Sequence, residues 1–285
     1  MKQENKSLIF LNSSVFLFGL AGIFAKWINI PALGITFGRV FFSSISLLVY
    51  LIATRQKILT DSRKDFLKLV FCGIILAVHW WSFLGSVQKS SVATGTITFS
   101  SFPLFVTVFE AILGRRKIRL NDLIFATSII VGVAVTCPSF SVSSDDMQGF
   151  SLGLISAVSY AILTLCNKNF TGRINESKIS FYEQSSAMIF LLPIVLLNPF
   201  PVTVKDISLL VLLGVFTTAL AHTMFISSLK NVSASVAGVC SSMETVYGIL
   251  FAFVLLGEVP YVREIIGGLI IIITVTIRQY TIKTE

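Results

Sequence analysis

The sequence predicts an all-α integral membrane protein of ten transmembrane helices, arranged as two inverted repeats of five helices each. Three observations lead to this prediction: an apolar composition, ten apolar runs of membrane-spanning length, and a repeat of about half the chain. Of the 285 residues, 54% are hydrophobic and only 13% are charged, and the mean hydropathy is +0.87. Such a chain has too little polar surface to cover a water-soluble globule, so lipid is the expected solvent.

The apolar runs are each long enough to cross about 30 Å of hydrocarbon, which takes roughly 20 helical residues. They are continuous runs rather than alternating strips, which favours helices over strands. The first run continues to Trp27 and further runs follow it, so we interpret it as a membrane span and not as a cleaved signal peptide. The predicted spans are residues 8–28, 33–53, 67–87, 92–114, 121–137, 149–168, 179–198, 207–228, 233–256 and 264–280.

The basic residues indicate the orientation of the chain. A sequence pI near 9.4 is compatible with nucleic-acid binding, but most of the 22 Lys and Arg residues fall in segments on the side of the N-terminus. Only Lys89, Lys205 and Arg263 fall between spans on the opposite side. By the positive-inside rule, both termini are expected in the cytoplasm of a bacterial cell, with the chain in the inner membrane. The basic charge therefore reflects topology, and we expect no nucleic-acid partner.

An internal repeat appears when the second half of the chain is laid over the first at one constant offset in residue number. It predicts a first repeat at 1–141, an acidic linker at 142–148 and a second repeat at 149–285. Each half holds five spans, an odd number, so the second half is expected upside down relative to the first. Secondary transporters use this construction to expose a central site to either side in turn. The matching pairs include Lys26 with Lys168, Phe83 with Phe225, Ser91 with Ser233, Ser100 with Ser242 and Phe109 with Phe251.

Two related runs carry a family resemblance. They read SSVATGTITFSSFPLFVTVFE at 90–110 and NVSASVAGVCSSMETVYGILFAFVLLGEVP at 231–260. Together they resemble the paired signature of EamA-type transporters of the drug/metabolite transporter superfamily, over essentially the whole chain. Thr245 stands where the family often has Pro, and Arg116 where its first half often has an acid. The resemblance implies a cavity lined by spans 1–4 and 6–9, with spans 5 and 10 peripheral, and amino acids or related metabolites as the first substrate class, ahead of purine-like or drug-like compounds.

Ionisable residues inside the spans are the first candidates for a site, because a polar group in hydrocarbon is costly unless it is paired or faces water. Glu244, His222 and His79 lie near the middle of the membrane. Glu244 is the strongest candidate, and it could exchange a proton with His222, because imidazole titrates near neutral pH. The alternative for the histidines is hydrogen bonding in helix packing. Arg39 and Glu183 lie nearer helix ends, where they either gate or bind a substrate carboxylate or amine, or reach the lipid headgroups.

Aromatic residues on the same spans form a second group of candidates. Trp80, Phe102 and Tyr247 could stack on a planar or apolar part of a substrate, with ordinary packing as the alternative. The chain has no phosphate-binding glycine loop, no HExxH motif, no paired Cys/His spacing and no nucleophile elbow. We therefore expect neither an enzyme nor a bound metal or cofactor.

These features predict a secondary-active or facilitative transporter that exports small organic metabolites by alternating access around a central cavity. Its expected partners are a small-molecule substrate, the lipid bilayer and protons as a candidate coupling ion. Two alternatives stay open: a permease for metabolite uptake, and a membrane receptor or scaffold that does not transport.

Overall fold

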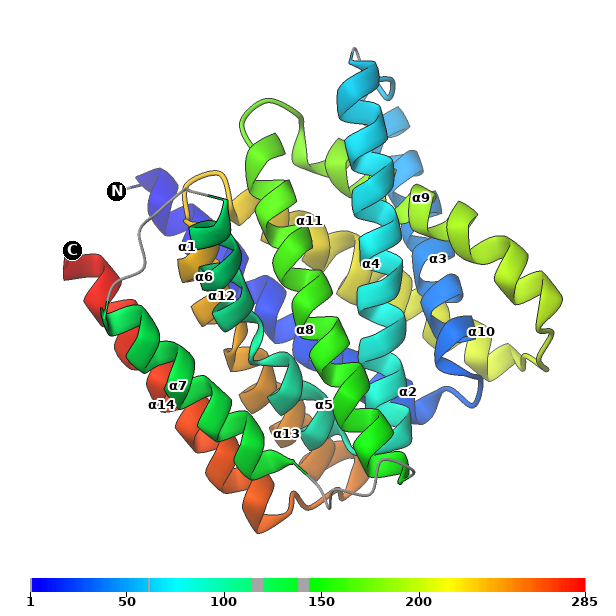
Figure 1. Cartoon of the computed structure of the whole chain (residues 1–285). Helices are drawn as coiled ribbons and strands as arrows, with labels where there is room; N and C mark the ends of the chain where they lie inside the picture. The colour runs from blue at the N-terminus through cyan, green and yellow to red at the C-terminus, as the bar shows by residue number, and fades with distance from the viewer. Residues whose placement is uncertain (1, 61, 114–119, 138–143, 285) are drawn as a thin grey trace.

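The computed structural model describes residues 2–60, 62–113, 120–137 and 144–284, and the regular structure in these ranges is helical (Figure 1). The all-α prediction is therefore confirmed for this part of the chain. Arg116 and residues 142 and 143 of the predicted linker lie outside the described residues. The helices are α1 (Lys2–Gly19), α2 (Ala21–Trp27), α3 (Ala32–Ala53), α4 (Arg63–Lys89), α5 (Val92–Phe99), α6 (Phe102–Ile112), α7 (Leu120–Thr136), α8 (Asp145–Phe170), α9 (Glu176–Leu197), α10 (Val204–Leu212), η1 (Leu213–Leu220), α11 (Ala221–Ser228), α12 (Ala234–Ser241), α13 (Met243–Leu256) and α14 (Val262–Thr284).

Within the described residues, 8 helices are long and apolar enough to cross a membrane. The chain is therefore a multi-pass membrane protein. The fifth predicted span falls in α7, whose apolar part, Leu123–Thr136, is shorter than the others. The tenth falls in α14, which is not one of the eight. The number of ten transmembrane helices thus stays a prediction.

Several predicted spans are interrupted near their middle. The first is broken at Leu20, between α1 and α2, and the ninth at Ser242, between α12 and α13. The fourth is broken between α5 and α6, directly before Pro103 in the first turn of α6. Proline lacks the amide hydrogen that would continue the helix, which explains this break. In the eighth span, η1 is π-helical, a form often found at functional sites. Interrupted helices leave backbone groups that can serve a ligand in the membrane.

Helices α7 and α14 pack side by side along one edge of the bundle (Figure 1). Their contact is close because glycines face each other: a Cβ on Gly267 would lie 2.5 Å from the Gly132 carbonyl oxygen. They share a small separate core, which includes Phe125, Ile129 and Ile271. The main core joins residues of the other helices. The pair α7 and α14 is therefore peripheral, as the family resemblance implies.

The two ends of the bundle differ in their polar contacts. At one end, which we call the N-terminal end, α1 begins beside the end of α11, and Asn231 Nδ2 donates to Ser7 Oγ at 2.9 Å. The segment after α3 meets the start of α9 there, where Lys178 Nζ donates to the Leu59 carbonyl at 3.2 Å. In the described segments between helices, Arg55, Lys57, Arg173 and Lys230 lie at this end.

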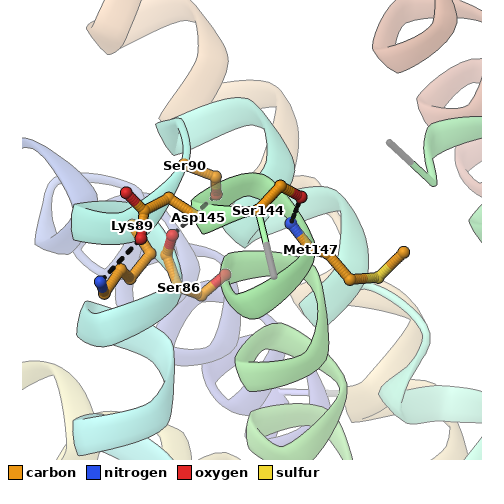
Figure 2. A network of polar contacts seen from close by, with 6 residues as sticks. All are labelled: Ser86, Lys89, Ser90, Ser144, Asp145 and Met147. Carbon is orange, nitrogen blue, oxygen red and sulfur yellow. Dashed lines mark hydrogen bonds and ion pairs between the residues drawn. The ribbon is translucent and has the colours of Figure 1, made fainter. Parts of the chain in front are cut away.

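At the opposite end, α4 ends beside the start of α8. Lys89 Nζ lies 2.7 Å from Asp145 Oδ1, and the Ser144 hydroxyl accepts the Met147 amide and so caps α8 (Figure 2). Both members of the ion pair are largely exposed, so the pair adds little stability on its own. The start of α8 is therefore held by its cap as well as by the ion pair.

Lys26 and Lys168 make equivalent contacts in the two halves. Lys26 Nζ donates to the Ser90 carbonyl at 3.0 Å, and Lys168 Nζ donates to the Val232 carbonyl at 2.9 Å. The two carbonyls are separated in sequence by the same offset as the two lysines. Each lysine thus lies beside the carbonyl end of a helix, α4 or α11, where a positive charge is favourable.

Candidate functional site

A small cavity lies in the middle of the bundle, among helices from both halves of the chain. Its volume of about 20 Å³ has room for roughly one water molecule, so a metabolite could enter only if helices moved apart. Five of the predicted site residues line it together. The lining residues are Phe18, Ala21, Arg39, His79, Trp80, Phe83, Phe99, Tyr160, His222 and Glu244.

Arg39 points from α3 into this interior. It is only 1% exposed, so it does not reach the lipid headgroups, and that alternative is wrong for this residue. Its Cζ lies 3.9 Å from the ring centroid of Trp80, a cation–π contact that strengthens when water is excluded. Its Nε donates to the hydroxyl of Thr218 at 3.1 Å. Thr218 belongs to η1, so the π-helical stretch supplies the partner that positions this guanidinium.

His222 and Glu183 form a buried pair across α11 and α9. The distance between Nε2 and Oε2 is 2.7 Å, and the two side chains are 1% and 0% exposed. Glu183 comes close to α4 because Gly73 faces it: a Cβ there would lie 2.6 Å from the Glu183 carbonyl oxygen. The Trp80 ring meets His222 edge to face at 5.7 Å between centroids. His222 therefore lines the cavity together with Trp80, and its pair with Glu183 joins the cavity wall to α9.

The sequence suggested that His222 could exchange a proton with Glu244, and this exchange stays a prediction. The carboxylate hydrogen-bonded to His222 is that of Glu183. Hydropathy places residues at a depth in the membrane but does not show which helices are neighbours. For Glu183 the sequence left open a gating or binding role and a contact with the lipid headgroups. The side chain is fully buried, so the headgroup alternative is wrong for this residue, and the gating or binding role stays a prediction.

Glu244 lies in the first turn of α13, just after the break at Ser242, and is 6% exposed. The start of a helix favours a negative charge. Arg39 faces the same cavity, so the site carries groups of opposite charge on opposite halves of the chain.

Thr245, which departs from the family pattern, joins the two broken spans. Its Oγ1 donates to the Thr96 carbonyl at 2.9 Å and also hydrogen-bonds to the hydroxyl of Ser100. The residue therefore ties α13 to the end of α5 beside the cavity.

His79 has its partners on α8. Its Nδ1 lies 2.8 Å from the hydroxyl of Ser156, and its ring lies 4.5 Å from that of Tyr160. These contacts match the helix-packing alternative for this histidine. Because it also lines the cavity, its part in binding stays a prediction.

Phe102 and Tyr247 do not line the cavity in the described part of the chain. The Phe102 ring stacks on the ring of Phe99, which lines the cavity, with 5.1 Å between the two centroids. Tyr247 packs edge-on against Phe16 at 5.3 Å, in the contact of α13 with α1. Their roles in binding stay predictions.

Phe18, Tyr160 and Thr218 are among the contributors to the site that were not predicted from the sequence. Phe18 and Tyr160 are related by the offset that also relates Lys26 to Lys168, so the repeat itself could have identified them as an equivalent aromatic pair. Nothing in the sequence distinguishes Thr218 from other hydroxyl residues in spans. Within the described residues, no group of three or more His, Cys, Asp or Glu side chains is placed to hold a metal ion.

The fold and the buried charged cavity are those of a polytopic membrane transporter. Residues 5–137 and again 147–278 match the EamA-like transporter family, and the chain belongs to this family. A solved crystal structure superposes with a TM-score of 0.72 at 15% identity, covering 97% of both chains, which shows that the fold is shared.

Named relatives are transporters of different kinds. The chain is 24% identical over 247 residues to the pseudopaline exporter CntI of Pseudomonas aeruginosa, covering 86% of this chain and 85% of that protein. It is 26% identical over 251 residues to the S-adenosylmethionine uptake transporter of Rickettsia conorii, covering 87% and 83%. An uncharacterized transporter of Bacillus subtilis is 22% identical over 275 residues, covering 93% and 87%.

Proposed function

We propose that this transporter exports a small organic metabolite across a bacterial cytoplasmic membrane by alternating access around the central cavity. The observation that carries the proposal is the cavity itself. It holds Arg39 from the first half of the chain and Glu244 from the second, both buried. Ionisable side chains inside membrane spans are costly, so a buried guanidinium and a buried carboxylate at one cavity support a functional site. They suit a solute that carries both a carboxylate and an amine, such as an amino acid or a related metabolite.

We also propose that the chain has ten transmembrane helices in two inverted repeats, with both termini in the cytoplasm. Three observations support the repeat. The family matches the chain twice, in consecutive stretches. Lys26 and Lys168 make equivalent contacts at equivalent positions. The breaks before α6 and before α13 also fall at equivalent places, since Phe102 and Glu244 are related by the same offset as the two lysines. Two halves related in this way can rock about a central site.

Protons are the proposed coupling ion, and the His222–Glu183 pair is the place where one would bind. Two groups 2.7 Å apart can hold a proton between them, as a neutral hydrogen bond or as an ion pair. The Trp80 ring contacts both His222 of this pair and Arg39. A change in the protonation of the pair can therefore shift the position of Arg39 through this ring.

The test uses purified protein in two stages. A thermal-shift screen of amino acids, nucleobases and sulfur-containing metabolites identifies a stabilising solute, and counterflow in liposomes then measures exchange of that solute in labelled form. We expect stabilisation by a solute with a carboxylate and an amine, followed by exchange. A stabilising solute with no exchange at any pH would support the receptor or scaffold alternative. The direction is read with a pH gradient that is acidic on the side opposite the termini. Under this gradient, accumulation of the solute on the side of the termini would support uptake, and its movement to the acidic side would support export.

A further inference from the structure

A groove of about 460 Å³ opens at the N-terminal end of the bundle. It lies between the last turns of α3, the start of α9 and the last turns of α11, and its size is that of a pocket for a small molecule. Its wall includes Leu47 and Tyr50 of α3, Ser177 of α9, and Thr223 and Ser227 of α11. Unlike the central cavity, this space can hold a metabolite without any movement of the helices.

The three helices α3, α9 and α11 run from this groove towards the central cavity, as the spacing of their residues shows. On α3, Ser43 lies four residues from Arg39 in the cavity and four residues from Leu47 in the groove, so the three share one face. On α9, Ser180 and Gln184 follow Ser177 at spacings of three and seven. On α11, Thr223 of the groove follows His222 of the cavity directly. We call Ser43, Ser180, Gln184 and Thr223, which lie along these stretches of α3, α9 and α11, the intervening layer.

The polar atoms of this layer are buried without hydrogen-bond partners among the described residues. They are Ser43 Oγ, Ser180 Oγ, both amide atoms of Gln184, and Thr223 Oγ1. Ser43, Ser180 and Gln184 are each 0% exposed. Native proteins rarely leave buried polar groups without partners, and each such group calls for an explanation. Helix packing alone would be served better by apolar side chains, because hydroxyl and amide groups lose their bonds to water there.

We propose that Ser43, Ser180, Gln184 and Thr223 line a passage through which a polar, hydrogen-bonding solute moves between the groove and the central cavity. Hydroxyl and amide side chains both donate and accept, so they can replace the water around a charged or neutral polar group. They carry no charge of their own, so they do not hold the solute as tightly as Arg39 or Glu244 would. Conduction needs this combination of favourable entry and easy release. The proposal rests on the proposed transport function and assigns its route on the N-terminal side.

Accessibility of introduced thiols tests the passage. Ser43→Cys and Ser180→Cys are compared with Ser14→Cys, whose parent serine is also 0% exposed but donates to the Leu11 carbonyl at 2.7 Å. A charged, membrane-impermeant methanethiosulfonate reagent is added on the side of the termini, and labelling of the native cysteines in the wild type is subtracted. Minor conformations of proteins are populated at roughly 0.1–10%, so we expect labelling of both passage positions at least about tenfold faster than Ser14→Cys. Labelling no faster than the control in folded variants would overturn the proposal.

A second variant guards against misfolding and separates the two proposals. Gln184→Leu removes an amide without hydrogen-bond partners among the described residues, so we expect it to raise the apparent Tm and to slow counterflow. The control is Gln148→Leu, on the exposed face of α8, which should leave counterflow unchanged. A raised Tm with unchanged counterflow would contradict the passage. Thiol labelling is read on the protein itself, without any solute. Fast labelling in a protein that never exchanges solute would therefore support the passage and contradict the transport function.

Discussion

His222 Nε2 and Glu183 Oε2 lie 2.7 Å apart in the interior of the bundle, and neither side chain reaches the surface. The hydrogen bond joins α11 to α9, and the Trp80 ring contacts the His222 ring edge to face. Removal of one member of a buried pair leaves the other without compensation, whereas replacement of both by apolar residues is often close to neutral. The stability of the protein should therefore depend on the two residues jointly.

Leucine substitutions separate the pair from its single members. We expect His222→Leu and Glu183→Leu each to destabilise the protein by about 3–5 kcal/mol, because each leaves one polar group buried alone. The double substitution to leucine should be close to neutral. The measurement is the apparent Tm of the four proteins in one detergent. A loss in the double variant equal to the sum of the two single losses would show that the two residues are not coupled.

Glu244 should be required for binding rather than for folding. Glu244→Gln keeps the shape of the side chain and removes its charge, so we expect the variant to insert and to keep its Tm without solute. The wild type should gain about 2.7 kcal/mol of stability at a solute concentration of 100 Kd, and this gain should be lost in the variant. Asp146→Asn, on the exposed start of α8, is the matched control. Undiminished stabilisation of Glu244→Gln would remove Glu244 from the site.

Gly73 should tolerate no side chain, because it brings the backbone of Glu183 against α4. The Cβ of Gly73→Ala would lie 2.5 Å from the Ser186 Cβ and 2.6 Å from the Glu183 carbonyl oxygen. Overpacking of this kind typically costs about 1–3 kcal/mol, and we expect a lower Tm with slower exchange. Gly85→Ala, on the same helix, would bring its Cβ only to 3.2 Å from a flexible Leu152 methyl group and should be tolerated. Equal tolerance of both would contradict the packing account.

The equivalent lysines should stabilise the two halves alike. Lys26→Met and Lys168→Met each remove hydrogen bonds from a charged donor to carbonyls at a helix end. Both lysines are partly exposed, so we expect each loss to be about 1 kcal/mol. Lys64→Met, exposed in the first turn of α4, should change the apparent Tm little. A large effect of one lysine with none of the other would weaken the inverted repeat.

The sequence predicts the class of fold well because lipid imposes long apolar helices on any chain that crosses it. It also predicts residues that line the cavity, such as Arg39 and Glu244, because buried charge in a membrane is rare and costly. It does not predict the partner of His222, since Glu183 and Glu244 are both carboxylates within spans and only the packing of α9 against α4 and α11 decides between them. The sequence also does not show where the Tyr247 ring lies. It packs against Phe16 of α1 and does not line the cavity in the described part of the chain.

The hydroxyl of Thr218 shows a second limit. Its contact with Arg39 depends on the π-helical turn of η1, where Thr218 Oγ1 also donates to the Leu213 carbonyl at 2.8 Å. A π-helix shifts the direction of the following side chains relative to an α-helix. Hydropathy patterns with a period of 3.6 residues do not reveal such a turn, so the neighbour of Arg39 could be found only from the fold.

Counterflow in liposomes tests the central claim most directly, with wild type, Glu244→Gln and Asp146→Asn measured side by side on the solute found by thermal shift. We expect rapid exchange by the wild type and by Asp146→Asn, and exchange at least about tenfold slower by Glu244→Gln, a difference of about 1.4 kcal/mol. Equal exchange by all three proteins would contradict the claim that the solute crosses the membrane through the cavity that Glu244 and Arg39 share.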